Sequence, residues 1–121
     1  MARATILSFK DLMVWQKAMK LAGRIYAASQ SFPADERFGL VAEIRKTARS
    51  IPANIAEGKM RLSPKDFRHF ISIALGSAGE LHTQILLAGQ EGYLSDSRTS
   101  ELEEYVEEVG RMLRGLERAL A

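Results

Sequence analysis

Apolar residues recur at spacings of three and four along most of the chain, which is the period of an amphipathic α-helix. The pattern breaks at Phe32-Pro33, after Gly58 and at Gly92, where residues typical of helix ends occur. We therefore predict helices over about residues 10–31, 35–58, 64–91 and 97–120. Because no repeat or long linker separates them, residues 1–121 are predicted to form one all-α domain, an antiparallel up-down-up-down four-helix bundle.

The first predicted helix carries more apolar surface than a simple bundle requires. Its two apolar rows consist of Leu12, Trp15, Met19, Ala22 and Tyr26, and of Val14, Ala18, Leu21 and Ile25. Together they cover nearly half of the circumference, whereas a stripe about 100° wide is enough for one packed face. The excess predicts a subunit contact that covers Val14, Leu21 and Ile25. Alternatively, the helix lies deep between two neighbours.

Pro52 lies inside a segment whose flanks are both typical of helix. The same apolar stripe continues on both sides of it, through Val41, Ile44, Ala48, Ile51 and Ile55. This continuity predicts a single second helix that is kinked at Pro52. A proline in a helix interior costs about 3 kcal/mol, so the fold or the function must offset it. The kink either aims Arg45, Arg49 and Asn54 at one another or at a ligand, or it is a tolerated irregularity.

The middle of the third predicted helix lacks bulky side chains, since Gly76, Ser77, Ala78 and Gly79 follow one another. We expect a second backbone or a large side chain to pack closely there, so that Gly76→Leu would destabilise the fold by overpacking. Polar residues near this opening could form a hydrogen-bonded cluster with Arg45. The candidates are Asn54, Glu57, Ser77 and Glu80. The alternative is that they are solvated surface.

The two halves of the chain differ in charge, although the formal net charge is only +2. Residues 1–61 hold 11 Lys and Arg against 5 Asp and Glu, whereas residues 62–121 hold 6 against 10. Such polarity is typical of a nucleic-acid-binding face. It is equally typical of two surfaces that meet each other in an oligomer.

The sequence lacks the residues that several kinds of catalytic and binding site require. The chain has no cysteine, so a disulfide, a thiolate nucleophile and a cysteine-ligated metal are excluded. His69 and His82 are its only histidines, and Glu80 lies two residues from His82, whereas a metal-binding bundle uses Glu-x-x-His pairs. Nucleophile-elbow, phosphate-loop and dinucleotide-binding motifs are missing. We therefore predict no catalytic residues, no metal site, no cofactor and no enzymatic activity.

The chain also lacks a targeting signal that we can recognise. No signal-peptide apolar stretch begins it, and nowhere do about 18 apolar residues run together. We expect a cytoplasmic protein without a membrane partner.

Four segments resemble one known family. They are DLMVWQKA at 11–18, FP at 32–33 followed by ERFGL at 36–40, SIPANIAEG at 50–58 and ALGSAGEL at 74–81. With them the chain, from residue 9 to about 120, resembles the four-helix-bundle proteins first noticed as reading frames inside intervening sequences of bacterial large-subunit ribosomal RNA genes. The resemblance implies an antiparallel bundle that assembles into a ring of five subunits, with no established enzymatic activity. A distant relative, the accessory variability determinant of diversity-generating retroelements, is a basic pentamer that binds nucleic acid and a reverse transcriptase.

The chain departs from the family pattern within its second predicted helix. Glu43 occupies a position where the family usually has glutamine, and Lys46, Thr47 and Arg49 replace a more apolar stretch. The extra carboxylate weakens the case for a simple basic groove, and Arg49 partly restores it.

These observations favour a non-catalytic pentameric scaffold that binds nucleic acid or a ribonucleoprotein. Its contacts would be mainly to phosphates, with little readout of sequence. The candidate residues are Lys17, Lys20, Arg24, Arg45, Lys46 and Arg49. The competing hypothesis is a protein–protein adaptor that binds no nucleic acid and whose basic half contacts the acidic half of a neighbouring subunit.

Overall fold

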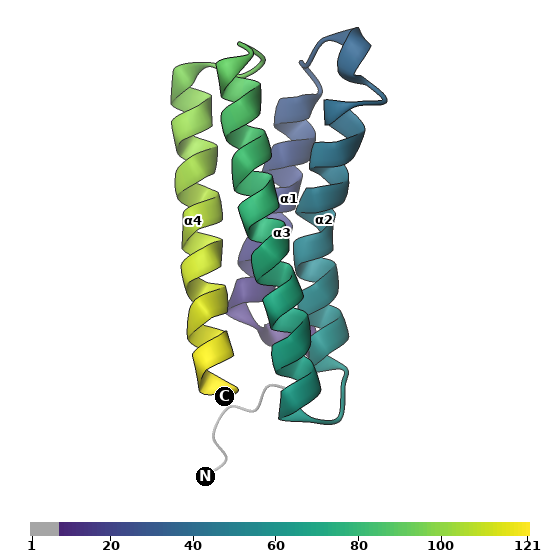
Figure 1. Ribbon diagram of the computed structural model, residues 1–121, viewed down its shortest axis with the longest axis vertical. Coiled ribbons are helices and arrows are strands. Elements are labelled where there is room, and N and C mark those ends of the chain that lie inside the picture. The colour runs from purple at the N-terminus through teal and green to yellow at the C-terminus, as the bar shows by residue number, and fades with distance from the viewer. Residues whose placement is uncertain (1–7) are drawn as a thin grey trace.

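The computed structural model describes residues 8–121, and four long helices account for most of them. The helices are α1 (Met13–Ser29), α2 (Leu40–Lys59), α3 (Pro64–Gln90) and α4 (Asp96–Ala119), with two 3₁₀ turns, η1 (Phe9–Asp11) and η2 (Ala34–Glu36). Figure 1 shows the α1–α2 and α3–α4 connections at one end of the molecule and the α2–α3 connection at the other. Residues 8–121 contain no strand, and the prediction of an all-α four-helix bundle is confirmed.

The core consists of the apolar faces that the periodicity marks. α3 packs against α2 and α4, and α1 also packs against α2 and α4. Each fully buried Leu, Ile or Val side chain contributes about 1.5–3 kcal/mol relative to an exposed one. The largest of them are Leu21, Ile25, Ile44, Ile51, Ile55, Ile71, Leu81, Ile85, Leu102, Val106, Val109 and Leu113.

The wide apolar surface of α1 is used inside one chain. Val14, Leu21 and Ile25 are buried in the core of the single chain, so the prediction that they form a subunit contact is wrong. The reason is that α1 has two neighbours, α2 and α4, and two packed faces need a wider stripe than one. The exposed apolar side chains of the two rows are Met19 and Tyr26.

The starts of α3 and α4 follow directly from the sequence. Ser63 Oγ accepts a hydrogen bond from the Asp66 N–H at 3.1 Å, and Pro64 occupies the first turn. Ser95 Oγ accepts a bond from the Arg98 N–H at 3.1 Å in the same way. Both helices begin within one residue of the predicted positions.

The start of α2 differs from the prediction of residue 35. Ala34–Glu36 forms a 3₁₀ turn, and Gly39 then has a non-helical backbone, with φ −104° and ψ −109°. The helix begins at Leu40, whose N–H donates to Glu36 Oε1 at 3.1 Å. A Cβ atom on residue 39 would lie 2.8 Å from that oxygen. Glycine at this position therefore lets the Glu36 carboxylate cap the helix from outside.

Glu36 also links the α1–α2 connection to the α3–α4 connection, because Tyr93 Oη donates a hydrogen bond to Glu36 Oε2 at 3.0 Å. This bond, together with partial desolvation and the negative charge of Glu36, raises the pKa of Tyr93 above its ordinary value of 10.0. The stability that this hydrogen bond contributes is fully present at pH values below the ordinary pKa of tyrosine, and it is lost as the pH rises through the raised pKa of Tyr93.

We expect Glu36→Gln to lower the pKa of Tyr93 toward its ordinary value, because the neutral amide accepts a weaker hydrogen bond and no longer repels the tyrosinate anion. Tyrosinate absorbance, titrated in the wild type and in the variant, measures this shift. Tyr93→Phe assigns the transition to Tyr93. A Tyr93 titration that Glu36→Gln leaves unchanged would show that the hydrogen bond does not control it.

α2 runs as one helix through Pro52, which is buried. The prediction of a single helix is therefore confirmed. Because proline has no N–H, the carbonyl of Ala48 lacks its usual helical donor. The kink that we infer from this missing bond stays a prediction.

The close helix contacts lie elsewhere than predicted. A Cβ atom on Gly76 or Gly79 would meet no heavy atom within 4 Å, so the expected tight packing at these glycines is wrong. Both lie on an exposed face of α3. The tight approach is instead at Gly58, where an added Cβ would lie 2.9 Å from atoms of both Phe67 and Phe70.

By length and composition alone, α3 is long and apolar enough to cross a membrane. The central helix of a water-soluble bundle meets the same criterion. Since α3 contacts both α2 and α4, its composition is weak evidence for a membrane span.

Candidate functional site

The basic candidates on α1 face the acidic surface of α4. Lys17 Nζ lies 2.9 Å from Glu108 Oε1, and an Arg24 nitrogen lies 3.2 Å from Glu101 Oε1. Both cations also lie over the ring of Tyr105, at 5.2 and 4.8 Å from its centroid. The basic half of the sequence thus meets the acidic half within one chain at this seam.

The Lys17–Glu108 pair affects both partners. The hydrogen bond between them raises the pKa of Lys17 and lowers the pKa of Glu108. The pair is partly exposed, so salt screens it. Lys17 and Arg24 are already matched by carboxylates, which makes them weaker candidates for phosphate contacts than the sequence suggested.

The basic candidates on α2 lie at the seam with α1. Arg45 Nε donates to Ser29 Oγ at 2.8 Å, and another of its nitrogens donates to the Tyr26 carbonyl at 3.2 Å. The Arg45 guanidinium therefore satisfies groups in the last turn of α1 and complements its dipole. It also lies 5.1 Å from the centroid of the Tyr26 ring.

Arg49 contacts the same tyrosine, because one of its nitrogens donates to Tyr26 Oη at 3.3 Å. Lys46 is exposed one turn before Arg49, and no ion pair to an acid is found for it among residues 8–121. Lys20, exposed on α1, likewise has none within that range. Tyr26, Arg45, Lys46 and Arg49 form what we call the Tyr26 patch.

The predicted polar cluster does not form as a hydrogen-bonded group. Asn54 Nδ2 donates to the Ser50 carbonyl at 2.8 Å within α2, and Glu57 pairs with Arg61 at 2.8 Å. Among the described residues, no hydrogen bond joins Ser77 or Glu80 to them. The reason is that Arg45 is engaged with α1, that Glu80 is exposed, and that the α2 side chains bond locally.

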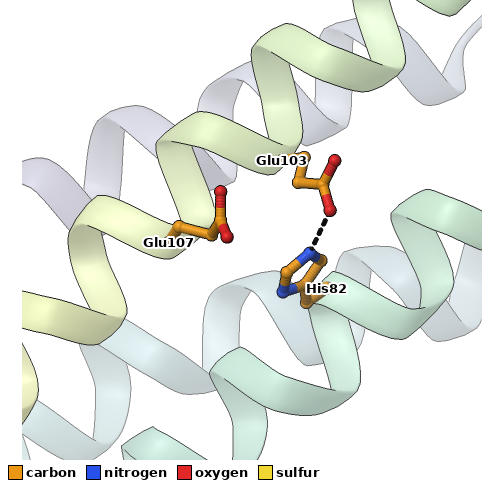
Figure 2. Close-up of side chains that lie close together, drawn as sticks. All are labelled: His82, Glu103 and Glu107. Carbon is orange, nitrogen blue, oxygen red and sulfur yellow. Dashed lines mark hydrogen bonds and ion pairs between the residues drawn. The ribbon is translucent and has the colours of Figure 1, made fainter.

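The structure brings together a second group of polar residues that the spacing of residues along the sequence did not predict. His82 Nε2 lies 2.7 Å from Glu103 Oε2, and donor atoms of His82, Glu103 and Glu107 all lie within 4.8 Å of one another. Figure 2 shows the two carboxylates of α4 on the side that faces the imidazole of α3. A search for metal-ligand spacing within a single helix pairs His82 only with Glu80, because Glu103 and Glu107 lie on α4. The available signal was the Glu103–Glu107 pair at i, i+4 on the following antiparallel helix.

A groove of about 310 Å³ adjoins this group between α3 and α4. Gly79 and Gly110 keep it open, since a Cβ atom on either would meet no heavy atom within 4 Å. Its lining combines apolar, acidic and basic side chains, namely Leu75, Ala78, His82, Val106, Glu107, Arg111 and Arg114.

The architecture and its sequence match a described family. The model of the 23S rRNA-intervening sequence protein family matches residues 10–115, which is most of the chain. The chain belongs to this family. The resemblance that the four sequence segments carry is thereby confirmed.

The fold of this member of the 23S rRNA-intervening sequence protein family also occurs in a solved structure. A crystal structure of a protein of unknown function from the S23 ribosomal protein family of Bacteroides thetaiotaomicron matches it with a TM-score of 0.80 and 24% sequence identity. The match covers 87% of this chain and 95% of that chain. No curated protein matches the chain. Neither the family nor the similar fold points to an enzymatic activity.

Proposed function

We propose that this protein is a non-catalytic, pentameric scaffold of the cytoplasm that binds nucleic acid or a ribonucleoprotein through the Tyr26 patch. The observation that carries the proposal is that the half-buried Arg45 and the exposed Arg49 both contact Tyr26 at the α1–α2 seam, with the exposed Lys46 next to Arg45 on α2. Proteins that bind single-stranded nucleic acid combine a basic track along the backbone with aromatic rings on which bases stack.

The residues of the patch contribute unequally. Lys46 and Arg49 are exposed, and Arg49 uses only one of its five N–H donors on Tyr26, so both have donors available for phosphate oxygens. Arg45 mainly holds the end of α1. Lys20 lies six residues before Tyr26 on α1, about 120° away around the helix axis and on the side of Lys17 and Arg24, so it stands apart from the patch. Lys17 and Arg24 are matched by Glu108 and Glu101.

Assembly into an oligomer would increase the affinity of a patch that binds weakly in one chain. A ring of five copies, as the family resemblance implies, presents the Tyr26 patch several times and gains avidity from one long nucleic acid. Large apolar side chains at the surface are available for such contacts, among them Phe38, Met60 and Leu62, which are 88%, 69% and 103% exposed.

Light scattering tests the assembly. We expect a particle of five times the 13.5 kDa chain, because exposed apolar side chains favour association and the family resemblance implies a ring of five. A monomer at micromolar concentration would contradict the proposed scaffold.

Binding of labelled single-stranded RNA and duplex DNA at low salt tests the ligand. We expect measurable affinity for at least one of them, with RNA favoured if bases stack on Tyr26. An assembled protein that binds neither at low salt would instead be the protein–protein adaptor.

A further inference from the structure

We propose that His82, Glu103 and Glu107 bind a divalent transition-metal ion of the Zn²⁺ class, which would join α3 to α4. This site is separate from the Tyr26 patch and does not depend on nucleic-acid binding. It combines one imidazole nitrogen and two carboxylate oxygens from two facing helices (Figure 2).

The distances between the donor atoms suit such an ion. Ligand bonds of about 2.0–2.1 Å in a tetrahedral zinc site place neighbouring donor atoms about 3.3 Å apart. The three side chains bring one donor pair to 2.7 Å and all donors within 4.8 Å of one another. This range brackets the required spacing, and we infer that rotation of the side chains brings the donors to it.

The helices hold the donors in register. Glu103 and Glu107 lie four residues apart on α4 and therefore share one of its faces. His82 faces them from α3 and already contacts Glu103. Val106 and Ala78, which flank the group on the two helices, are buried, so both backbones are fixed by the core.

The chemistry of the donors selects the class of ion. Mixed nitrogen and oxygen ligands suit Zn²⁺ and its neighbours, whereas Mg²⁺ and Ca²⁺ prefer all-oxygen ligands. Two carboxylates and a neutral imidazole supply a charge of −2 that balances the ion. Among the described residues Glu107 has no hydrogen bond or ion pair of its own, so an ion would give its carboxylate a partner.

The surroundings leave a fourth ligand position accessible. The His82 and Glu103 side chains are only 29% and 36% exposed, and the side toward the groove is open at Gly79 and Gly110. Three protein ligands and an open position describe a zinc site that accepts water or an anion. Arg111 and Arg114 line the same groove and would favour an anion there.

The test titrates untagged protein with ZnCl₂ by calorimetry and follows the melting temperature. We expect saturable binding of one ion per chain, a higher melting temperature with Zn²⁺, and no comparable effect of Mg²⁺. His82→Ala and Glu107→Gln should each weaken binding more than about tenfold, since loss of even an outer-shell partner costs at least that much. Glu107 is exposed, so its variant should fold normally.

His69→Ala is the matched control, because His69 is exposed on the same helix outside the group. It should bind Zn²⁺ like the wild type. Wild-type protein that binds no Zn²⁺ would overturn the proposal. Equal affinity in the wild type and both site variants, or an equal loss in His69→Ala, would do the same by showing adventitious binding.

Discussion

Gly58→Leu is expected to lower the free energy of unfolding by about 3 kcal/mol, at the upper end of the usual range for overpacking. Gly58 is buried where α2 meets α3, and an added Cβ would already lie 2.9 Å from Phe67 and Phe70 and 3.2 Å from the Phe67 carbonyl. The carbonyl belongs to the backbone of α3, so the helices must separate. This loss exceeds the gain of about 1 kcal/mol in helix propensity.

Gly76→Leu is the matched control on α3. Its site is open within the chain, so we expect equal or slightly greater stability from the better helix former. Chemical denaturation followed by circular dichroism, at one fixed chain concentration, compares the two variants with the wild type. A larger loss of stability in Gly76→Leu than in Gly58→Leu would contradict close packing at Gly58 and open space at Gly76.

The double variant Lys46→Glu, Arg49→Glu is expected to weaken RNA binding more than tenfold. Charge-assisted hydrogen bonds contribute about 1.5–3 kcal/mol each, and 1.4 kcal/mol already corresponds to a factor of ten. Both residues are exposed, so the fold should survive the change. Fluorescence anisotropy with one labelled RNA measures the affinities.

Lys65→Glu, Arg68→Glu is the matched control. These two residues have the same spacing on α3, are also exposed, and give the same change in net charge. We expect a much smaller loss of affinity from this variant, which reflects only the general charge of the protein. Equal losses in the two double variants would remove the Tyr26 patch as the binding surface.

The fold could be predicted because its causes are local. The three-and-four spacing of Ile44, Ala48, Ile51 and Ile55 marks the buried face of α2. Ser63 with Pro64 starts α3. The start of α2 could not be predicted in this way. Its cap is Glu36, whose carboxylate is held partly by Tyr93 from a distant connection.

Packing between helices was harder to predict than the helices themselves. Gly76 and Gly58 are both glycines in helices, and only the rotation of each helix decides that Gly58 meets a neighbour and Gly76 meets solvent. The same holds for His82, whose partners Glu103 and Glu107 lie on another helix. Such pairs depend on the axial register between helices, which a single sequence does not define.

The candidate basic residues lie at or near the surface, but the partners of Lys17 and Arg24 could not be read from the sequence. Lys17 and Arg24 face Glu108 and Glu101 because α1 lies beside α4. The charge difference between the halves of the sequence thus arises partly from an internal seam. The remaining candidates for phosphate contacts are therefore mainly the exposed cations of α2, Lys46 and Arg49.

The salt dependence of RNA affinity shows whether the Tyr26 patch binds the phosphates of a nucleic acid. For the wild type, we predict that the logarithm of the association constant falls linearly with the logarithm of salt concentration, as counterion release requires. The slope should be shallower in Lys46→Glu, Arg49→Glu by about 0.7 for each lost phosphate contact with a single strand. No detectable binding at low salt, or a slope that this variant shares with the wild type, would contradict nucleic-acid binding through the Tyr26 patch.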